Sequence, residues 1–320
     1  MTQPTAQLPL TILCGKGGVG KTTLSLALAL RHAGQGRTVL VVTSHPLPEL
    51  AVSVSLSGLR ERQPAAAANL FIIHLDPREI LNEQVRHQIP SQMLADAVLS
   101  SRIYKSLVEV APGLKELAFL GRLHQLAEEM SSEEAAGKGE PARKFDLLIW
   151  DAPATGHFLQ TLKVSRNFEQ YLSGPFAVLG RQLTQFFADS SHFALLPVTT
   201  LEDMAVEETI ELCQKLAGEF AIQPRVVLCN MTSPLLASTA SRADGPARLE
   251  IPAGGMGPEL QFILDRSEIE RTIFRRLSSS VETKFRTVER EPQWDADLEL
   301  LLAVAGQLDG LPVDSPARPD

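Results

Sequence analysis

Cysteine is scarce in this sequence. The 320 residues include three cysteines, Cys14, Cys213 and Cys229, and no two of them form a C-x-x-C pair. A structural zinc site of that pattern and a disulfide framework are therefore not expected. Cys14 and Cys229 each end an apolar stretch, which predicts that both are small buried residues.

An excess of positive charge and a long apolar run are also lacking. The formal net charge is −8, which argues against a protein that coats nucleic acid with a basic face. No run approaches the roughly 18 apolar residues of a membrane span, and the N-terminus lacks the basic-then-apolar pattern of a signal peptide. We therefore expect a cytoplasmic protein with no nucleic-acid partner and at most a peripheral membrane contact made through another protein.

Apolar stretches alternate with helical patterns along the chain. The stretches lie at 10–14, 38–43, 70–75, 145–150, 192–198 and 225–230. A helix is expected at 202–220, and residues 283–288 are expected to form an edge strand. Continuous apolar runs bounded by turn residues predict strands that are covered on both faces. We expect an α/β fold with a doubly wound, mainly parallel sheet, in one domain that spans residues 1–320.

Two helical blocks interrupt this alternation. The first covers about 77–129, with breaks at Pro90 and at Pro112-Gly113, and the second covers 158–188. They predict a helical subdomain, inserted at about 77–143 and 158–190, that forms a cap at the carboxyl edge of the sheet. Residues at about 130–144 and 238–257 are rich in small and polar residues and are expected to be flexible loops.

A glycine-rich segment between the first expected strand and helix carries the strongest motif. The run GKGGVGKTT, residues 15–23, fits the phosphate-binding pattern G-x-x-x-x-G-K-[ST] in the strand–loop–helix context that this pattern requires. Its N–H groups and the positive end of the helix dipole favour phosphate. The expected nucleotide-binding residues are Gly17, Gly18, Val19, Gly20, Lys21, Thr22 and Thr23. Lys21 would reach the β- and γ-phosphates, and the Thr22 hydroxyl would coordinate Mg²⁺.

Lys16 adds a second lysine directly after the first glycine of this loop. The run GKGGVGKTT resembles the deviant phosphate-binding loop of the SIMIBI class of nucleotidases. In that class the additional lysine crosses a dimer interface to the nucleotide of the partner subunit. The resemblance implies a catalytic role for Lys16 and a dimer, either a homodimer or a heterodimer with a related ATPase subunit.

The segment DAPATGH, residues 151–157, follows the fourth expected strand. An aspartate at the end of a buried strand is well placed to hold Mg²⁺ in phosphate-loop enzymes, so Asp151 is expected to be a metal-site and catalytic residue. The Pro and Gly that follow predict a loop able to change shape. The segment resembles the switch D-T-A-P-T-G-H of the arsenite-transporter and tail-anchored-protein-targeting ATPases, the ArsA-like family.

Two further positions are compared with that family. Asn230 ends the strand at 225–230, where the family has an asparagine that reads the adenine edge, although a turn-forming role is the alternative. At Thr43-Ser44-His45-Pro46 the family usually has S-T-D-P, whose aspartate activates the attacking water. His45 could accept a proton but offers no fixed negative charge, so weak or absent hydrolysis is expected.

The resemblance implies a dimeric ATPase that binds ATP and Mg²⁺ and acts as a nucleotide-dependent switch for a protein client. Two alternatives stay open: a self-sufficient homodimeric ATPase in membrane-protein targeting or anion extrusion, and a nucleotide-gated scaffold without turnover. In the targeting ATPase, comparable helices form a groove for apolar transmembrane segments, but ordinary core packing or protein docking would also explain the apolar helices of this chain.

Overall fold

The computed structural model describes residues 10–43, 69–131, 145–171, 175–234, 236, 258–291, 298–311 and 313. The expected loops at about 130–144 and 238–257 lie outside this part of the chain, apart from residues 130 and 131, which end a helix. None of the helices in the described ranges combines the length and the hydropathy needed to cross a bilayer.

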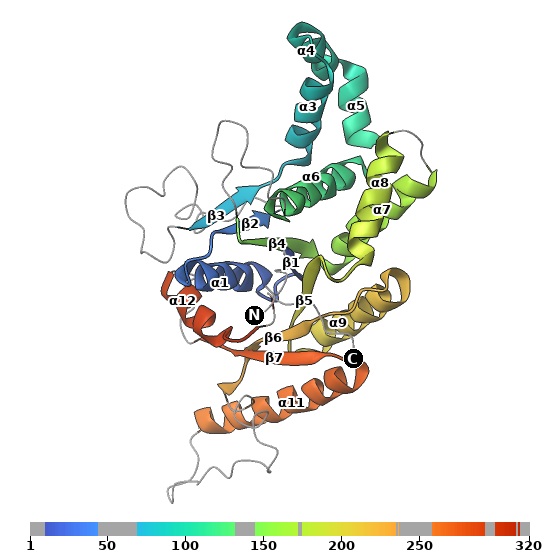
Figure 1. Ribbon diagram of the computed structural model, residues 1–320. Coiled ribbons are helices and arrows are strands. Elements are labelled where there is room, and N and C mark those ends of the chain that lie inside the picture. Colours follow the sequence, from blue (N-terminus) through green and yellow to red (C-terminus); the bar gives the residue numbers. More distant parts are fainter. Residues whose placement is uncertain are drawn as a thin grey trace, which may run out of the picture.

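A seven-stranded sheet forms the centre of the molecule (Figure 1). Its order is β3-β2-β4-β1-β5-β6-β7, and every neighbouring pair is parallel. The strands are β1 (Leu10–Gly15), β2 (Val39–Thr43), β3 (Leu70–His74), β4 (Leu147–Ala154), β5 (Phe193–Thr200), β6 (Val226–Thr232) and β7 (Lys284–Glu289). This arrangement confirms the expected α/β fold with a parallel sheet, the fold of phosphate-loop nucleotidases.

The position of each strand in the sheet matches its residue pattern. The inner strands β1 and β5 are buried at every position, as expected for parallel strands covered on both faces. The edge strands β3 and β7 are only partly buried. The edge position expected for the strand near residue 283 is therefore confirmed.

Helices cover both faces of the sheet. The helices are α1 (Lys21–Gly34), α3 (Pro77–Gln88), α4 (Gln92–Ser100), α5 (Arg102–Val110), α6 (Leu114–Ser131), α7 (Thr155–Tyr171), α8 (Pro175–Ala188), α9 (Asp203–Lys215), α11 (Pro258–Ser280) and α12 (Leu298–Gln307). Side chains of α1 and α12 form one hydrophobic cluster with residues on one face of the sheet. Those of α6, α7 and α8 share another cluster with the opposite face.

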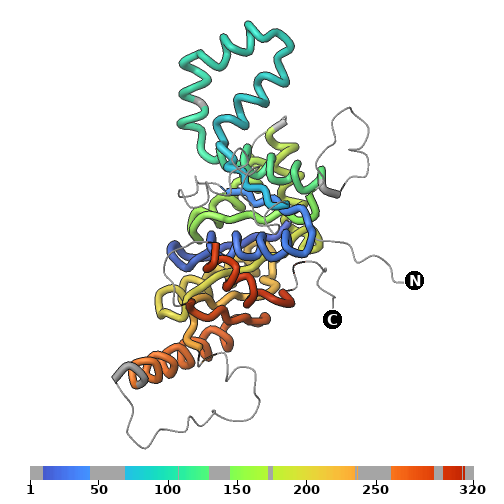
Figure 2. The backbone as a smooth tube through the Cα atoms, turned by 90° about the vertical axis from the view of Figure 1, so that its left-hand side faces the viewer, coloured from blue at the N-terminus to red at the C-terminus, as the bar shows by residue number. Residues whose placement is uncertain are grey.

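The first helical block divides into two parts. Helix α6 packs on the sheet, because its Leu117, Leu120 and Leu123 lie in the same cluster as Trp150 of β4. Helices α3, α4 and α5 extend away from the sheet instead (Figures 1 and 2). Helix α3 begins after Asp76, whose carboxylate accepts a hydrogen bond of 2.8 Å from the N–H of Arg78.

Three boundaries differ from the sequence-based expectation. Strand β4 continues through Ala154 instead of ending at Asp151, because it pairs with β1 as far as Gly15. Strand β6 likewise runs past Asn230 to Thr232. The helix expected at 202–220 is α9 followed by a π-helical turn, Leu216–Phe220, and the chain leaves this turn at Ala221 with a positive φ of 57°.

The cysteines are buried, as expected from the sequence. Cys14 and Cys229 have no exposed surface, and Cys213 has 5%. Burial raises the pKa of the Cys213 and Cys229 thiols to about 12, so both thiols are protonated at neutral pH. They are structural residues with little thiolate character.

The Trp150 side chain packs the sheet against the helices α6 and α7. Its ring is fully buried, with ring centroids 5.4 Å from Phe119 of α6 and 5.5 Å from Phe158 of α7. Its Nε1 has no hydrogen-bond partner among the described residues. We expect Trp150→Ala to lower the free energy of unfolding by about 3–5 kcal/mol, since it leaves a large cavity.

Trp150→Phe is the matched variant. It keeps an aromatic ring and removes the unpaired N–H, whose burial costs about 1–3 kcal/mol, so its net effect is expected to be under half that of the alanine variant. Urea unfolding followed by circular dichroism measures both values. Equal losses in the two variants would contradict the packing described here.

Candidate nucleotide-binding site

Those predicted site residues that the structure describes lie at the carboxyl edge of the central strands. The glycine-rich loop leaves β1, which lies between β4 and β5, and enters α1. In the ladder between β1 and β4, Leu13 lies opposite Asp151, so the loop begins directly beside this aspartate. The parallel sheet thus brings together segments that are separated by more than a hundred residues in the sequence.

The loop reaches the helix through left-handed backbone. Gly18 has a φ of 84° and Gly20, the residue that precedes α1, has a φ of 88°, in the region that side-chain-bearing residues rarely adopt. No side chain caps the first turn of α1. The N–H groups of this turn are therefore suited to an anion. Gly17 is exposed, Val19 is buried and anchors the loop in the core, and Thr23 is partly buried in this first turn.

Lys21 folds back over the loop. Its ammonium donates hydrogen bonds to the carbonyl oxygens of Gly15, at 3.0 Å, and Lys16, at 2.9 Å. Burial lowers the pKa of this ammonium, and the nearby carboxylate of Asp151 opposes the shift. The lysine therefore places a partly desolvated positive charge at the mouth of the loop, where a phosphate charge would be stabilised.

Thr22 and Asp151 meet below the loop. The Thr22 hydroxyl donates a hydrogen bond of 2.6 Å to Oδ2 of Asp151. Ser25, one turn further along α1, lies with its hydroxyl 3.4 Å from Oδ1 of the same carboxylate. Ser25 was not among the predicted site residues, although its position three residues after Thr22 puts both hydroxyls on one face of the helix.

These residues fit a magnesium nucleotide. Mg²⁺ prefers oxygen ligands, and in phosphate sites it is held by one or two protein oxygens together with phosphate oxygens. A hydroxyl and a carboxylate within hydrogen-bonding distance supply that set. The described residues contain no cluster of three or more His, Cys, Asp or Glu side chains that could hold a metal by itself, so the fit depends on the nucleotide.

The segment that contains Asp151 is more regular than expected. The sequence predicted a loop, but Pro153 and Ala154 belong to β4, and α7 starts immediately at Thr155. Gly156 lies in the first turn of this helix. This prediction of a loop is therefore wrong: the parallel ladder extends the strand, and the helix begins without a linker.

Asn230 contacts the glycine-rich loop from β6. Its amide nitrogen donates a hydrogen bond of 2.9 Å to the carbonyl oxygen of Val19, and the residue is 5% exposed. The next residue, Met231, has a φ of 56°. A Cβ on Gly20 would lie 2.3 Å from the Asn230 amide nitrogen. The close approach of these two segments thus requires glycine at position 20.

Lys16 faces α9 of its own chain. Its ammonium lies 3.8 Å from a carboxylate oxygen of Glu208, and the two side chains are 31% and 36% exposed. The sequence alone assigned no role to Glu208. His45, the expected substitute for the water-activating aspartate, lies outside the described residues.

Gly20→Ala tests the contact between the loop and β6. The variant adds a methyl group that overlaps the Asn230 amide, and it forces alanine into left-handed backbone. Gly18→Ala is the control, because it has a similar φ but no atom within 4 Å of its Cβ. We expect Gly18→Ala to cost about 1–2 kcal/mol in the free energy of unfolding, and Gly20→Ala to cost at least about 1 kcal/mol more.

A double substitution isolates the contact. In an Asn230→Ala background the overlap disappears, so the additional cost of Gly20→Ala should fall to the Gly18→Ala level. Chemical denaturation of the four variants gives this comparison. If the two glycine variants cost the same in the wild-type background, the close approach of Gly20 and Asn230 is contradicted.

Comparison with known proteins agrees with this geometry. Residues 9–180, more than half of the chain, match the family model described as anion-transporting ATPase. The chain is 25% identical over 271 residues to an arsenical pump-driving ATPase of Acidiphilium multivorum, which covers 77% of this chain and 44% of that protein. It is 26% identical over 228 residues to one of Escherichia coli, covering 66% and 37%.

A relative from a eukaryote is similar over a shorter range. The ATPase get3 of Schizosaccharomyces pombe is 29% identical over 177 residues, which is 54% of this chain and 46% of that protein. The chain thus spans half or less of the length of these curated relatives. The matched region of the family model includes the glycine-rich loop and the Asp151 segment, and the chain belongs to the anion-transporting, ArsA-like ATPase family.

Proposed function

We propose that this chain binds Mg·ATP at the glycine-rich loop. The contact between the Thr22 hydroxyl and the Asp151 carboxylate carries the proposal, because it pairs two oxygen ligands next to the ammonium of Lys21. The uncapped first turn of α1 would receive the phosphates. Asn230 would take part in adenine recognition, for which a carboxamide offers both a donor and an acceptor.

The proposed working form is a dimer in which Lys16 reaches the nucleotide of the partner subunit. In the isolated chain its ammonium has a partly exposed partner at 3.8 Å, Glu208, and such ion pairs contribute little to stability. Exchanging this carboxylate for a triphosphate oxygen would be favourable, because charge-assisted contacts to phosphate are stronger. The partner is either a second copy of the chain or a related ATPase subunit.

The nucleotide would act as a switch for a protein client. Asp151 is followed within four residues by α7, which packs against α6 and α8. Exchange of ATP for ADP beside Asp151 would therefore shift α7, and with it the helical subdomain at about 77–143 and 158–190. Hydrolysis by this chain would be slow, because His45 brings no fixed negative charge beside the attacking water.

Self-association in Mg·ATP tests the role of Lys16. We expect the wild-type chain to dimerise when Mg²⁺ and a slowly hydrolysed ATP analogue are added, and Lys16→Ala to stay monomeric while it still binds nucleotide. Lys215→Ala is the control, since it removes an exposed lysine that also pairs with a glutamate, at 3.2 Å. Sedimentation velocity gives the oligomeric state. If the Lys16→Ala variant dimerises as well as the wild type, the proposal that Lys16 reaches the nucleotide of the partner subunit is contradicted.

Turnover tests the role of His45. Restoring a carboxylate with His45→Asp should raise the rate of ATP hydrolysis by at least about tenfold, within the range that a positioned general base contributes. His74→Asp, at the exposed end of β3, makes the same change of side chain away from the proposed water position. Phosphate release under saturating Mg·ATP measures the rate. Brisk hydrolysis by the wild type, unchanged or lowered in His45→Asp, would show that His45 does not limit turnover.

A further inference from the structure

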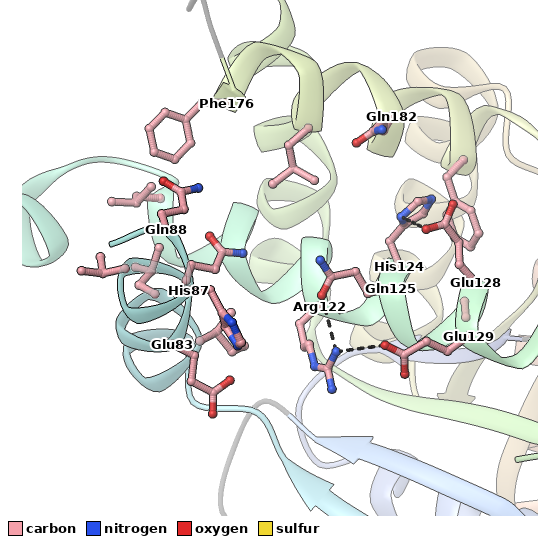
Figure 3. Close-up of a pocket in the computed structure, with 18 of the residues that line it drawn as sticks. Glu83, His87, Gln88, Arg122, His124, Gln125, Glu128, Glu129, Phe176 and Gln182 are labelled. Carbon is pink, nitrogen blue, oxygen red and sulfur yellow. Dashed lines mark hydrogen bonds and ion pairs between the residues drawn. The ribbon is translucent and has the colours of Figure 1, made fainter. Parts of the chain in front are cut away.

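A carboxylate on α11 is buried, unlike those of the exposed ion pairs in this protein. In the pocket beside α6, for example, Arg122 pairs with Glu129, whose side chain is 61% exposed (Figure 3). The Glu270 side chain, which pairs with Arg266 at 2.9 Å through Oε1, is only 4% exposed. Burial of a carboxylate is unfavourable unless both of its oxygens have partners, so the partner of the second oxygen indicates what Glu270 holds.

The second oxygen of Glu270 binds the backbone at the end of β6. Oε2 accepts a hydrogen bond of 2.7 Å from the N–H of Ser233, the first residue after this strand. The Ser233 hydroxyl lies 2.7 Å from that of Ser267, which donates in turn to the carbonyl oxygen of Ile263. Ser233, Ser267 and Glu270 are each at most 6% exposed. This buried network fastens the end of β6 to one face of α11.

Strand β6 contains a bulge just before this network. Between Cys229 and Thr232, β6 has two residues where the parallel strand β7 has one. The two residues are Asn230 and Met231, and Met231 has a left-handed φ of 56°. Both side chains approach the glycine-rich loop, because a Cβ on Gly20 would lie 2.3 Å from Nδ2 of Asn230 and 3.4 Å from Cε of Met231. In a regular strand they would point to opposite faces, so the bulge redirects one of them.

Helix α11 holds Glu270 in a fixed place relative to β6. Ile273 of this helix and Cys229 of β6 belong to one hydrophobic cluster, and α11 lies beside β7 (Figure 1). The chain is therefore anchored at Cys229 before the bulge and at Ser233 after it. Met231 lies between these anchors in a region that residues with side chains rarely adopt, and such a conformation persists only where its surroundings enforce it. The loss of the Glu270 contact would weaken the second anchor.

The orientation of Asn230 decides which nucleobase it can select. Its Nδ2 donates to the carbonyl oxygen of Val19, so its Oδ1, which is an acceptor, points away from that carbonyl. An acceptor matches the 6-amino group of adenine and opposes the 6-oxo group of guanine or hypoxanthine. The selection of adenine by Asn230 would thus depend on the shape of the bulge.

We propose that Glu270 is a positioning residue for nucleobase selection, because its hydrogen bond to Ser233 keeps the bulge in the shape that directs Asn230. This inference rests on the proposed function for ATP as the ligand. It adds a residue that determines specificity without touching the nucleotide. A carboxylate that only stabilised the fold would affect the phosphate and base contacts alike, whereas a positioning role affects selection of the base.

Two substitutions separate the hydrogen bond from the charge. Glu270→Gln keeps the length of the side chain and an oxygen that can accept from the Ser233 N–H, but it removes the charge beside Arg266. Glu270→Asp keeps the charge and retracts the carboxylate by one C–C bond, about 1.5 Å, beyond hydrogen-bonding distance of that N–H. The matched control is Glu268→Asp, which makes the same change at an exposed residue of α11.

Calorimetric titration in the presence of Mg²⁺ compares three ligands. They are ATP, inosine triphosphate, which carries a 6-oxo group in place of the 6-amino group, and inorganic tripolyphosphate, which has no base. We expect the wild type, Glu268→Asp and Glu270→Gln to bind ATP at least about tenfold more tightly than inosine triphosphate, and Glu270→Asp to lower this ratio below about threefold. The affinity for tripolyphosphate should change less than about twofold in every variant.

Hydrogen exchange gives a reading without nucleotide. In the free protein, the Ser233 amide should exchange faster in Glu270→Asp than in Glu270→Gln or the wild type, because it loses its buried acceptor. Circular dichroism shows whether each variant is folded. If Glu270→Asp does not fold, the role of Glu270 is structural and the inference is overturned.

The titrations also decide between this inference and the proposed function. The inference is overturned if Glu270→Asp keeps the wild-type ratio, if Glu270→Gln loses it, or if the affinity for tripolyphosphate falls together with that for ATP. Equal binding of ATP and inosine triphosphate by the wild type would overturn it too, while leaving the glycine-rich loop as a phosphate site. A wild type that binds neither ATP nor tripolyphosphate would contradict the proposed function itself.

Discussion

The hydrogen bond between Thr22 and Asp151 is the contact on which the organisation of the site depends. It joins the first turn of α1 to β4 and so fixes where the glycine-rich loop sits above the sheet. The parallel order of β4, β1 and β5 makes the contact possible, because it places the ends of strands far apart in sequence at one edge. The same pair of oxygens is what a magnesium nucleotide would require.

This contact also connects the site to the rest of the molecule. Strand β4 passes from Asp151 into α7 without a linker, and Trp150, the preceding residue, packs against aromatic rings of α6 and α7. Helices α6, α7 and α8 therefore share a core with the strand that carries the aspartate.

Much of the fold follows from local patterns in the sequence. Apolar runs and turn residues located all seven strands to within a few residues. Pro90 and Pro112-Gly113 marked the breaks before α4 and before α6, but the break between α4 and α5 at Ser101 was not predicted. The extent of β4 was not predictable, because its pairing with β1 outweighs the turn preference of Pro153 and Gly156. Ser25 and the Lys16–Glu208 pair depend on how α1 and α9 pack, which local spacing does not contain.

The most direct test of the account is the magnesium dependence of ATP binding in wild type and Thr22→Val, measured by isothermal titration calorimetry. Valine has nearly the shape of threonine but lacks the hydroxyl that contacts Asp151. The account predicts that Mg²⁺ tightens ATP binding to the wild type by at least about tenfold and that this gain is lost in the variant. A wild-type affinity that does not change with Mg²⁺, or a variant that keeps the full gain, would contradict it.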